Sequence, residues 1–147
     1  MAVETLVMKA VLTVIVSWLA VTSELPATYD HPKVALAPAA QIAALRYPNV
    51  NPAFRPNVLA VYDDAHRTIY LNDKWTGASL ADLSVLVHEM VHHLQNRGDL
   101  KYACPGAREA PAYAAQDRFL ALFGRSVAGE FKLDALSMKL MTSCFSF

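Results

Sequence analysis

The clearest hydrophobic pattern in the chain lies between residues 79 and 97. Apolar side chains recur there with helical spacing, at Leu80, Leu83, Val87, Val91 and Leu94. This spacing gathers them on one face of an amphipathic helix. Ser79, followed three residues later by Asp82, resembles a capping box that opens a helix, and Gly98 suits its end. The pattern predicts a helix of about five turns over 79–97.

Two short runs rich in β-branched, aromatic and apolar residues precede this helix, over 58–62 and 68–71. The residues between them, 63–66, read Asp-Asp-Ala-His and favour a turn, so the two runs predict a β-hairpin. Further upstream, the pattern predicts a short strand over 33–37 and a brief helix over 39–47. The prolines that follow, Pro48, Pro52 and Pro56, mark an irregular loop.

Helical periodicity returns after the central helix. The segment from Arg108 to Phe123 predicts a second helix, which a loop of about ten residues would allow to fold back on the first. Pro111 disturbs this helix least if it begins near Arg108, whereas a start at Pro105 would place a kink at 107–111. A C-terminal helix is expected over about 131–143, supported by Leu133, Leu136, Leu140 and Met141.

The N-terminal segment is mostly apolar from Leu6 to Val21. Secretory signals combine a basic start, an apolar run and small residues at a cleavage site, but here Glu4 offsets Lys9 and residues 20–22 match such a site poorly. The run is also short for a membrane span. We therefore expect 1–25 to form the first helix of the domain, buried on most sides, with a signal or membrane anchor as the alternative. Cytoplasmic and periplasmic or secreted locations both stay open.

Length and composition narrow the possibilities. A chain of 147 residues predicts a single domain over 1–147, and the mixture of elements predicts the α+β class. Lys and Arg number 13 and Asp and Glu also 13, without a basic run, so no nucleic-acid partner is expected.

The central helix carries the strongest chemical motif, His88-Glu89-Met90-Val91-His92, an HExxH pentapeptide. Histidines at i and i+4 lie one above the other on a helix, so their ring nitrogens can share one metal ion. Glu89 lies one step round the helix, where it can reach a metal-bound water without being a ligand. His93 lies about 140° from His88 and cannot join the same metal, so it is expected to be partly buried or at the surface.

A catalytic zinc site uses three protein ligands and a water. The sequence lacks the Gly and His that metzincins have three and six residues after the second histidine, because Gln95 and Gly98 stand there. Glu109, near the start of the second helix, is the preferred third ligand. Cys104 and Asp117 remain alternatives.

With Glu109, the motif resembles that of the gluzincin class of zinc metallopeptidases, which has HExxH followed by a Glu on a second helix. The chain is most similar to the minimal gluzincins and to a family of short uncharacterised bacterial proteins with the core HEMVHHLQ…C…RE…YAAQDR. The resemblance covers about 55–145. It implies a zincin-like fold, zinc bound by His88, His92 and Glu109, and Glu89 as general base.

The resemblance also implies roles around the zinc. Larger gluzincins often have an Asp four residues after the ligand Glu, and here that position is Tyr113. Gln116 or Asp117 could instead orient a histidine, and Tyr113 is the first candidate for stabilising the oxyanion. In zincin-like folds the sheet edge beside the motif helix receives an extended peptide, so a peptide or protein substrate is expected. The alternatives are a zinc amidase acting on a small molecule or cell-wall peptide, and a non-catalytic binding domain.

The two cysteines, Cys104 and Cys144, leave two possibilities. They could form one disulfide that ties the C-terminal helix to the Glu109 segment, or they could be reduced thiols of a cytosolic protein.

Overall fold

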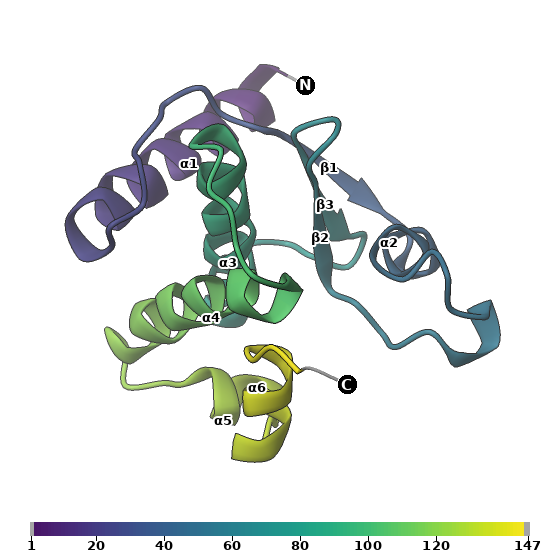
Figure 1. Ribbon diagram of the computed structural model, residues 1–147. Helices are drawn as coiled ribbons and strands as arrows, with labels where there is room; N and C mark the ends of the chain where they lie inside the picture. Colours follow the sequence, from purple (N-terminus) through teal and green to yellow (C-terminus); the bar gives the residue numbers. More distant parts are fainter. Residues whose placement is uncertain (1, 146–147) are drawn as a thin grey trace.

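The computed structural model describes residues 2–145, with the surroundings of side chains from Leu6 onward; Met1 and 146–147 of the expected domain lie outside the described residues. The elements follow one another as α1 (Ala2–Thr22), β1 (Lys33–Ala37), α2 (Ala39–Arg46), the 3-10 turn η1 (Pro52–Phe54), β2 (Ala60–Asp63), β3 (Thr68–Asn72), α3 (Leu80–Arg97), α4 (Pro105–Ala121), α5 (Val127–Phe131) and α6 (Ala135–Met141). The predicted α+β class is confirmed. Figure 1 shows α3 in the middle of the molecule, between α1, the sheet and α4.

The sheet has three strands in the order β1-β3-β2. β1 runs parallel to β3, and β2 runs antiparallel to it, so the predicted hairpin is confirmed. β2 begins at Ala60, two residues later than predicted, and ends at Asp63. One face packs on the main core through Ile69 and Leu71, and the other meets α2 through Val61 and Ile42. β2 lies at one edge of the sheet and lines a cleft beside α3.

α3 begins and ends where the sequence predicts, but its surroundings differ from the prediction. The Ser79 hydroxyl accepts a hydrogen bond from the Asp82 N–H at 3.0 Å. The Asp82 carboxylate turns away to accept from Gly77 and Thr76, so only half of the capping box forms. All residues from Ser84 to Gln95 are buried. Burial of the expected apolar stripe is confirmed for Val87, Val91 and Leu94, but burial extends beyond it to the polar side chains of the motif.

α1 is part of the core rather than separate from it. Leu12, Val16 and Leu19 are fully buried against the main core, while Val14 and Val21 on the other side are exposed. The expectation that this helix is buried on most sides is thus wrong. Within the described part of the chain, none of the helices combines the length and apolarity needed to cross a bilayer.

α4 begins earlier than the position that would leave Pro111 harmless. Cys104 caps the helix and Pro105 is its first residue, so Pro111 lies in the interior, where it removes one backbone hydrogen bond. Of the two starts considered, the earlier one at Pro105 is therefore the one formed, and one further turn precedes Glu109. Cys104 and Cys144 form a disulfide, with their Cα atoms 5.8 Å apart.

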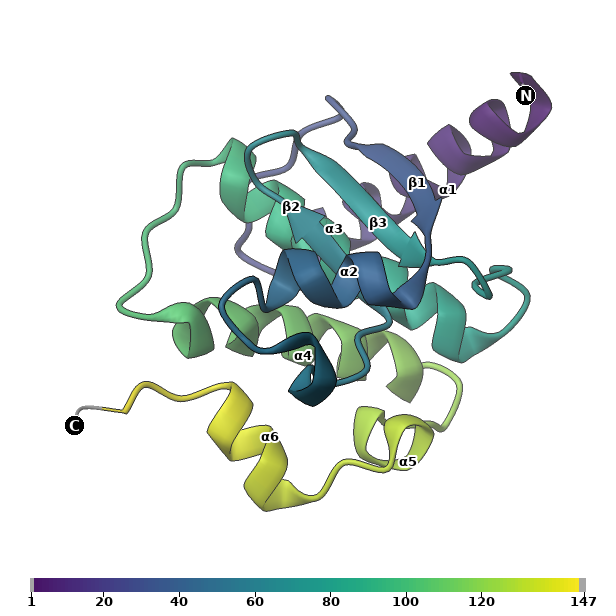
Figure 2. The same cartoon turned by 90° about the vertical axis from the view of Figure 1, so that its right-hand side faces the viewer.

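The C-terminal helix predicted over 131–143 is present but shorter, as α6 over Ala135–Met141. A further short helix that was not predicted, α5, precedes it and ends at Lys132, whose φ of 53° lies in the left-handed region. Leu136 and Leu140, which supported the prediction, are exposed. In Figure 2 both helices lie below α4, on the side away from the sheet, and α5 contacts the main core through Phe131.

Candidate metal centre

Two helices bring three potential metal ligands together. His88 and His92 lie one turn apart on α3, and Glu109 projects from α4, which packs beside it. His88 Nε2 is 2.9 Å from Glu109 Oε2, and His92 Nε2 is 3.1 Å from Glu109 Oε1. One ligand atom from each residue lies within 4.8 Å of the others. The geometry thus brings together the three residues that the sequence analysis selected.

Each histidine is fixed through its other ring nitrogen by a glutamine amide. Gln116 Oε1 lies 2.9 Å from His88 Nδ1, and its Nε2 donates to Ser84 Oγ. The Ser84 hydroxyl proton is already donated to the carbonyl of Ala81, so Ser84 must accept from Gln116. The amide oxygen of Gln116 therefore faces His88, which must donate from Nδ1.

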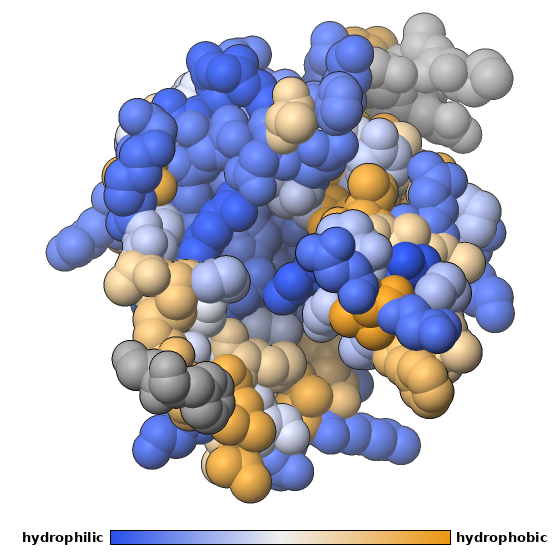
Figure 3. All heavy atoms as spheres, turned by 45° about the vertical axis from the view of Figure 1, so that its right-hand side comes forward, coloured by the Kyte–Doolittle hydropathy of each residue, from blue (hydrophilic) through white to orange (hydrophobic). Residues whose placement is uncertain are grey.

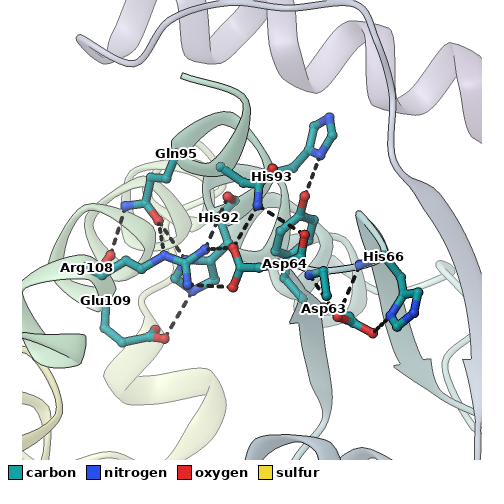
Figure 4. Close-up of polar contacts among 11 residues, drawn as sticks. Asp63, Asp64, His66, His92, His93, Gln95, Arg108 and Glu109 are labelled. Carbon is teal, nitrogen blue, oxygen red and sulfur yellow. Dashed lines mark hydrogen bonds and ion pairs between the residues drawn. The ribbon is translucent and has the colours of Figure 1, made fainter. Parts of the chain in front are cut away.

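The same reasoning applies to the second histidine. Gln95 Oε1 lies 2.8 Å from His92 Nδ1, while Gln95 Nε2 donates to the carbonyl of Arg108 (Figure 4). Gln95 was not predicted as a partner. Its position three residues after His92, on the same helix face, is the signal that could have found it.

These partners decide what the three ligand atoms can bind. A neutral histidine that donates from Nδ1 presents a lone pair at Nε2, and both Nε2 atoms face oxygens of Glu109, which are acceptors too. Such a cluster requires a cation between its members, either a metal ion or a second proton on the imidazoles. Burial alone would raise the pKa of Glu109. In the metal-free protein, hydrogen bonds from His88 and His92, which can donate from Nε2 only when the second proton is present, outweigh burial and hold this pKa well below the usual range.

Glu89 is enclosed beside the cluster without being part of it. The residue is 6% exposed, and its buried Oε2 has no hydrogen-bond partner among the described residues. Burial is the main cause that raises the pKa of Glu89 to about 7, with the charge of Glu109 adding to it and that of His88 opposing it. A carboxyl group with a pKa near neutrality can both take up and release a proton at physiological pH.

Tyr113 also lies at the cluster. Its ring centroid is 4.5 Å from that of His88, and its hydroxyl contacts Met141 Sδ at 3.7 Å. Burial, together with the charges of Glu109 and Glu89, raises the pKa of Tyr113 to about 12, so the hydroxyl keeps its proton and can donate.

The remaining candidates are used elsewhere. Cys104 is bonded to Cys144, which removes it as a metal ligand. Asp117 accepts a hydrogen bond from the Val127 N–H at the start of α5, so Gln116 rather than Asp117 orients a histidine. His93 is 1% exposed and lies between the Tyr62 hydroxyl and the Asp30 carbonyl, so the expectation that it is partly buried or at the surface is wrong.

The cluster opens into a cleft of about 1090 Å³. One wall comes from the end of α2, the chain before β2, and β2 itself, and the opposite wall from α4 and the α5–α6 region. Figure 3 shows the hollowed face, with hydrophilic surface within it and hydrophobic patches on its flanks.

Comparison with known proteins identifies a family to which the sequence is similar. A protein-family model described as "Domain of unknown function (DUF6647)" matches residues 4–146. The chain belongs to this family. No curated protein matches it, and no solved structure matches it. The DUF6647 match covers both ligand-bearing helices and the disulfide, so the whole site lies within the family domain.

Proposed function

We propose that this protein is a zinc-dependent hydrolase, a small metallopeptidase with a zincin-like fold and a gluzincin-type ligand set. One observation carries the proposal. Two histidine Nε2 lone pairs and the Glu109 carboxylate converge, and a buried carboxylic acid, Glu89, lies beside them with no hydrogen-bond partner for its Oε2 in the described part of the chain. A structural metal site has no need for such an acid.

The donor set fits zinc. Two imidazole nitrogens and one carboxylate are one of the usual three-residue sets of catalytic zinc sites, and they leave a fourth position open. His88 and His92 each donate from Nδ1 to a glutamine amide, which keeps Nε2 available as a ligand. When bound, zinc would act as a Lewis acid that lowers the pKa of a water molecule and polarises the substrate carbonyl.

The remaining chemistry belongs to the chain itself. Glu89 would take the proton of the attacking water on its carboxylate and return it to the nitrogen of the leaving amine. Its pKa of about 7 suits both transfers. Tyr113, whose hydroxyl stays protonated, is the candidate donor to the developing oxyanion; it would have to leave Met141 to do so.

The shape of the cleft favours a peptide over a small molecule. Its volume of about 1090 Å³ is at the upper end of the range of small-molecule pockets. It runs along β2, whose outer edge has no neighbouring strand among residues 2–145. Pairing alternates along an antiparallel ladder, and Leu59 bonds to Asn72, so Ala60 and Tyr62 point their backbone groups outward. An extended peptide could pair there.

The test combines metal analysis with turnover. The purified chain should bind about one zinc, and Glu109→Ala should weaken zinc binding by 10-fold or more. Glu89→Gln should keep zinc and lose hydrolysis of a fluorogenic peptide library. Glu130→Gln is a matched control, because Glu130 pairs with Arg125 and its side chain does not line the cleft. Zinc binding unaffected by Glu109→Ala would remove that ligand, and unchanged turnover in Glu89→Gln would remove the general base.

A further inference from the structure

Arg108, the residue before Glu109, lies between the β-hairpin and the metal centre. Its two terminal nitrogens bind the Asp64 carboxylate in a bidentate pair, at 2.9 and 2.6 Å. Its Nε donates to Gln95 Oε1 at 3.3 Å, and one terminal nitrogen also reaches the His92 carbonyl at 3.5 Å. Figure 4 shows these contacts as one connected group that ends at His92.

Each residue of this group restricts the orientation of the next residue's side chain. Gln95 is held at both ends of its amide by Arg108, at the oxygen by the side chain and at the nitrogen by the backbone carbonyl. Arg108 is held in turn by the planar match between its guanidinium and the Asp64 carboxylate. Asp64 follows β2 in the hairpin turn, and Asn96 of α3 donates to its carboxylate and to its backbone carbonyl.

The two histidines are therefore supported differently. The partner of His88, Gln116, is held by buried Ser84 on the same pair of helices. The partner of His92 depends on Arg108 and Asp64, whose side chains are 30% and 47% exposed. The chain of hydrogen bonds that holds His92 thus starts at the surface with Asp64, in the β2–β3 hairpin and not in the helices that carry the ligands.

We propose that Asp64, Arg108 and Gln95 act as one set of positioning residues that fixes the His92 imidazole for metal binding and links it to the β2–β3 hairpin. This inference rests on the metal-binding part of the proposed function, and not on hydrolysis. It connects the wall of the cleft to the metal ligand. A change in the position of Asp64 in the hairpin turn would alter the orientation of His92 through the side chains of Arg108 and Gln95.

The experiment compares zinc affinity in the full-length chain by competition with a chromophoric chelator. Removing the outer partner of a ligating histidine typically weakens metal binding by about 10–100-fold, so Gln95→Ala and Asp64→Asn should both weaken zinc binding, the latter by about 10-fold. Asp63→Asn is the matched control. This neighbouring aspartate makes its contacts within the turn, to His66 and Ala65, and should leave zinc affinity unchanged.

A double variant tests whether the residues act as a set. If Asp64 acts through Gln95, then Asp64→Asn combined with Gln95→Ala should bind zinc no more weakly than Gln95→Ala alone. In metal-free protein, the Nδ1 proton of His92, which is donated to Gln95, should exchange with water more slowly in the wild type than in Gln95→Ala and Asp64→Asn. A general loss of stability would speed the exchange of the His88 Nδ1 proton as well, whereas the inference expects that proton to be unaffected.

Several outcomes would overturn the inference. These are unchanged zinc affinity in Asp64→Asn, equal effects of Asp63→Asn and Asp64→Asn, or fully additive losses in the double variant. A wild type that binds zinc but cleaves no peptide would refute the hydrolase proposal alone, because the zinc affinities of the variants would still be compared. A wild type that binds no zinc would overturn both.

Discussion

Removing the disulfide between Cys104 and Cys144 should destabilise the fold by an amount that can be worked out from the structure. The bond closes a loop with a sequence separation of 40 residues. Loop-closure entropy for that length gives about 4 kcal/mol at 25 °C, an upper value because the reduced chain keeps some structure. Replacement of both cysteines by serine should cost little else, since Cys144 is exposed and serine at 104 can still cap α4.

Urea unfolding of the oxidised wild type and of the Cys104→Ser/Cys144→Ser variant measures this difference. The free energy of unfolding should fall by about 2–4 kcal/mol, which moves the midpoint by about 1–2 M urea for a chain of this size. Reductant should bring the wild type to the midpoint of the variant and leave the variant unchanged. The same midpoint for the oxidised wild type and the variant would refute the reasoning.

Two further predictions concern packing and charge. Gly106→Ala would put a Cβ atom closer than 3.0 Å to three backbone atoms of Ser143, so it should lower the free energy of unfolding, measured in urea, by about 1–3 kcal/mol. Gly129→Ala should lower it less, because the new Cβ atom would face one hydroxyl at 3.2 Å. Equal effects of the two substitutions would contradict this account. In metal-free protein, burial raises the pKa of Glu89 from 4.5 to about 7, so the folded state loses stability as pH rises between these values, by about 3 kcal/mol in total. Glu89→Gln should therefore be more stable than the wild type at pH 8 and similar to it at pH 4, and equal urea midpoints at pH 8 would show that burial does not penalise this charge.

Local signals in the sequence were enough to predict the elements that hold the ligands. The cap at Ser79 and the helical spacing predict α3 correctly, and the HExxH spacing puts His88 and His92 on one face. The convergence of Glu109 with them followed from a short connection between two helices, residues 98–104 in the structure. These features depend on neighbours along the chain, so they can be read without knowledge of the fold.

Features set by distant parts of the chain could not be predicted in this way. The spacing of three residues could suggest Gln95 as a partner of His92, but the contacts that hold its amide come from Arg108, and Arg108 binds Asp64, which is 44 positions away. The burial of α3 on all sides likewise depends on α1, the sheet and α4 together. The late start of the C-terminal helix, α6, follows a left-handed backbone conformation at Lys132, which the sequence does not signal because lysine is not favoured there.

The spacing of the ligands along the chain has a consequence for how the protein assembles. His88 and Glu109 are separated by only 21 positions, whereas Asp64 reaches Arg108 across 44 and Arg118 of α4 reaches the carbonyl of Thr22 in α1 across 96. Short loops close at a smaller entropic cost and at a higher rate than long ones. The helical hairpin of α3 and α4 is therefore expected to form early in folding, with its ligands already facing one another. The N-terminal helix and the β-hairpin would then dock onto a nucleus that can already capture a metal ion.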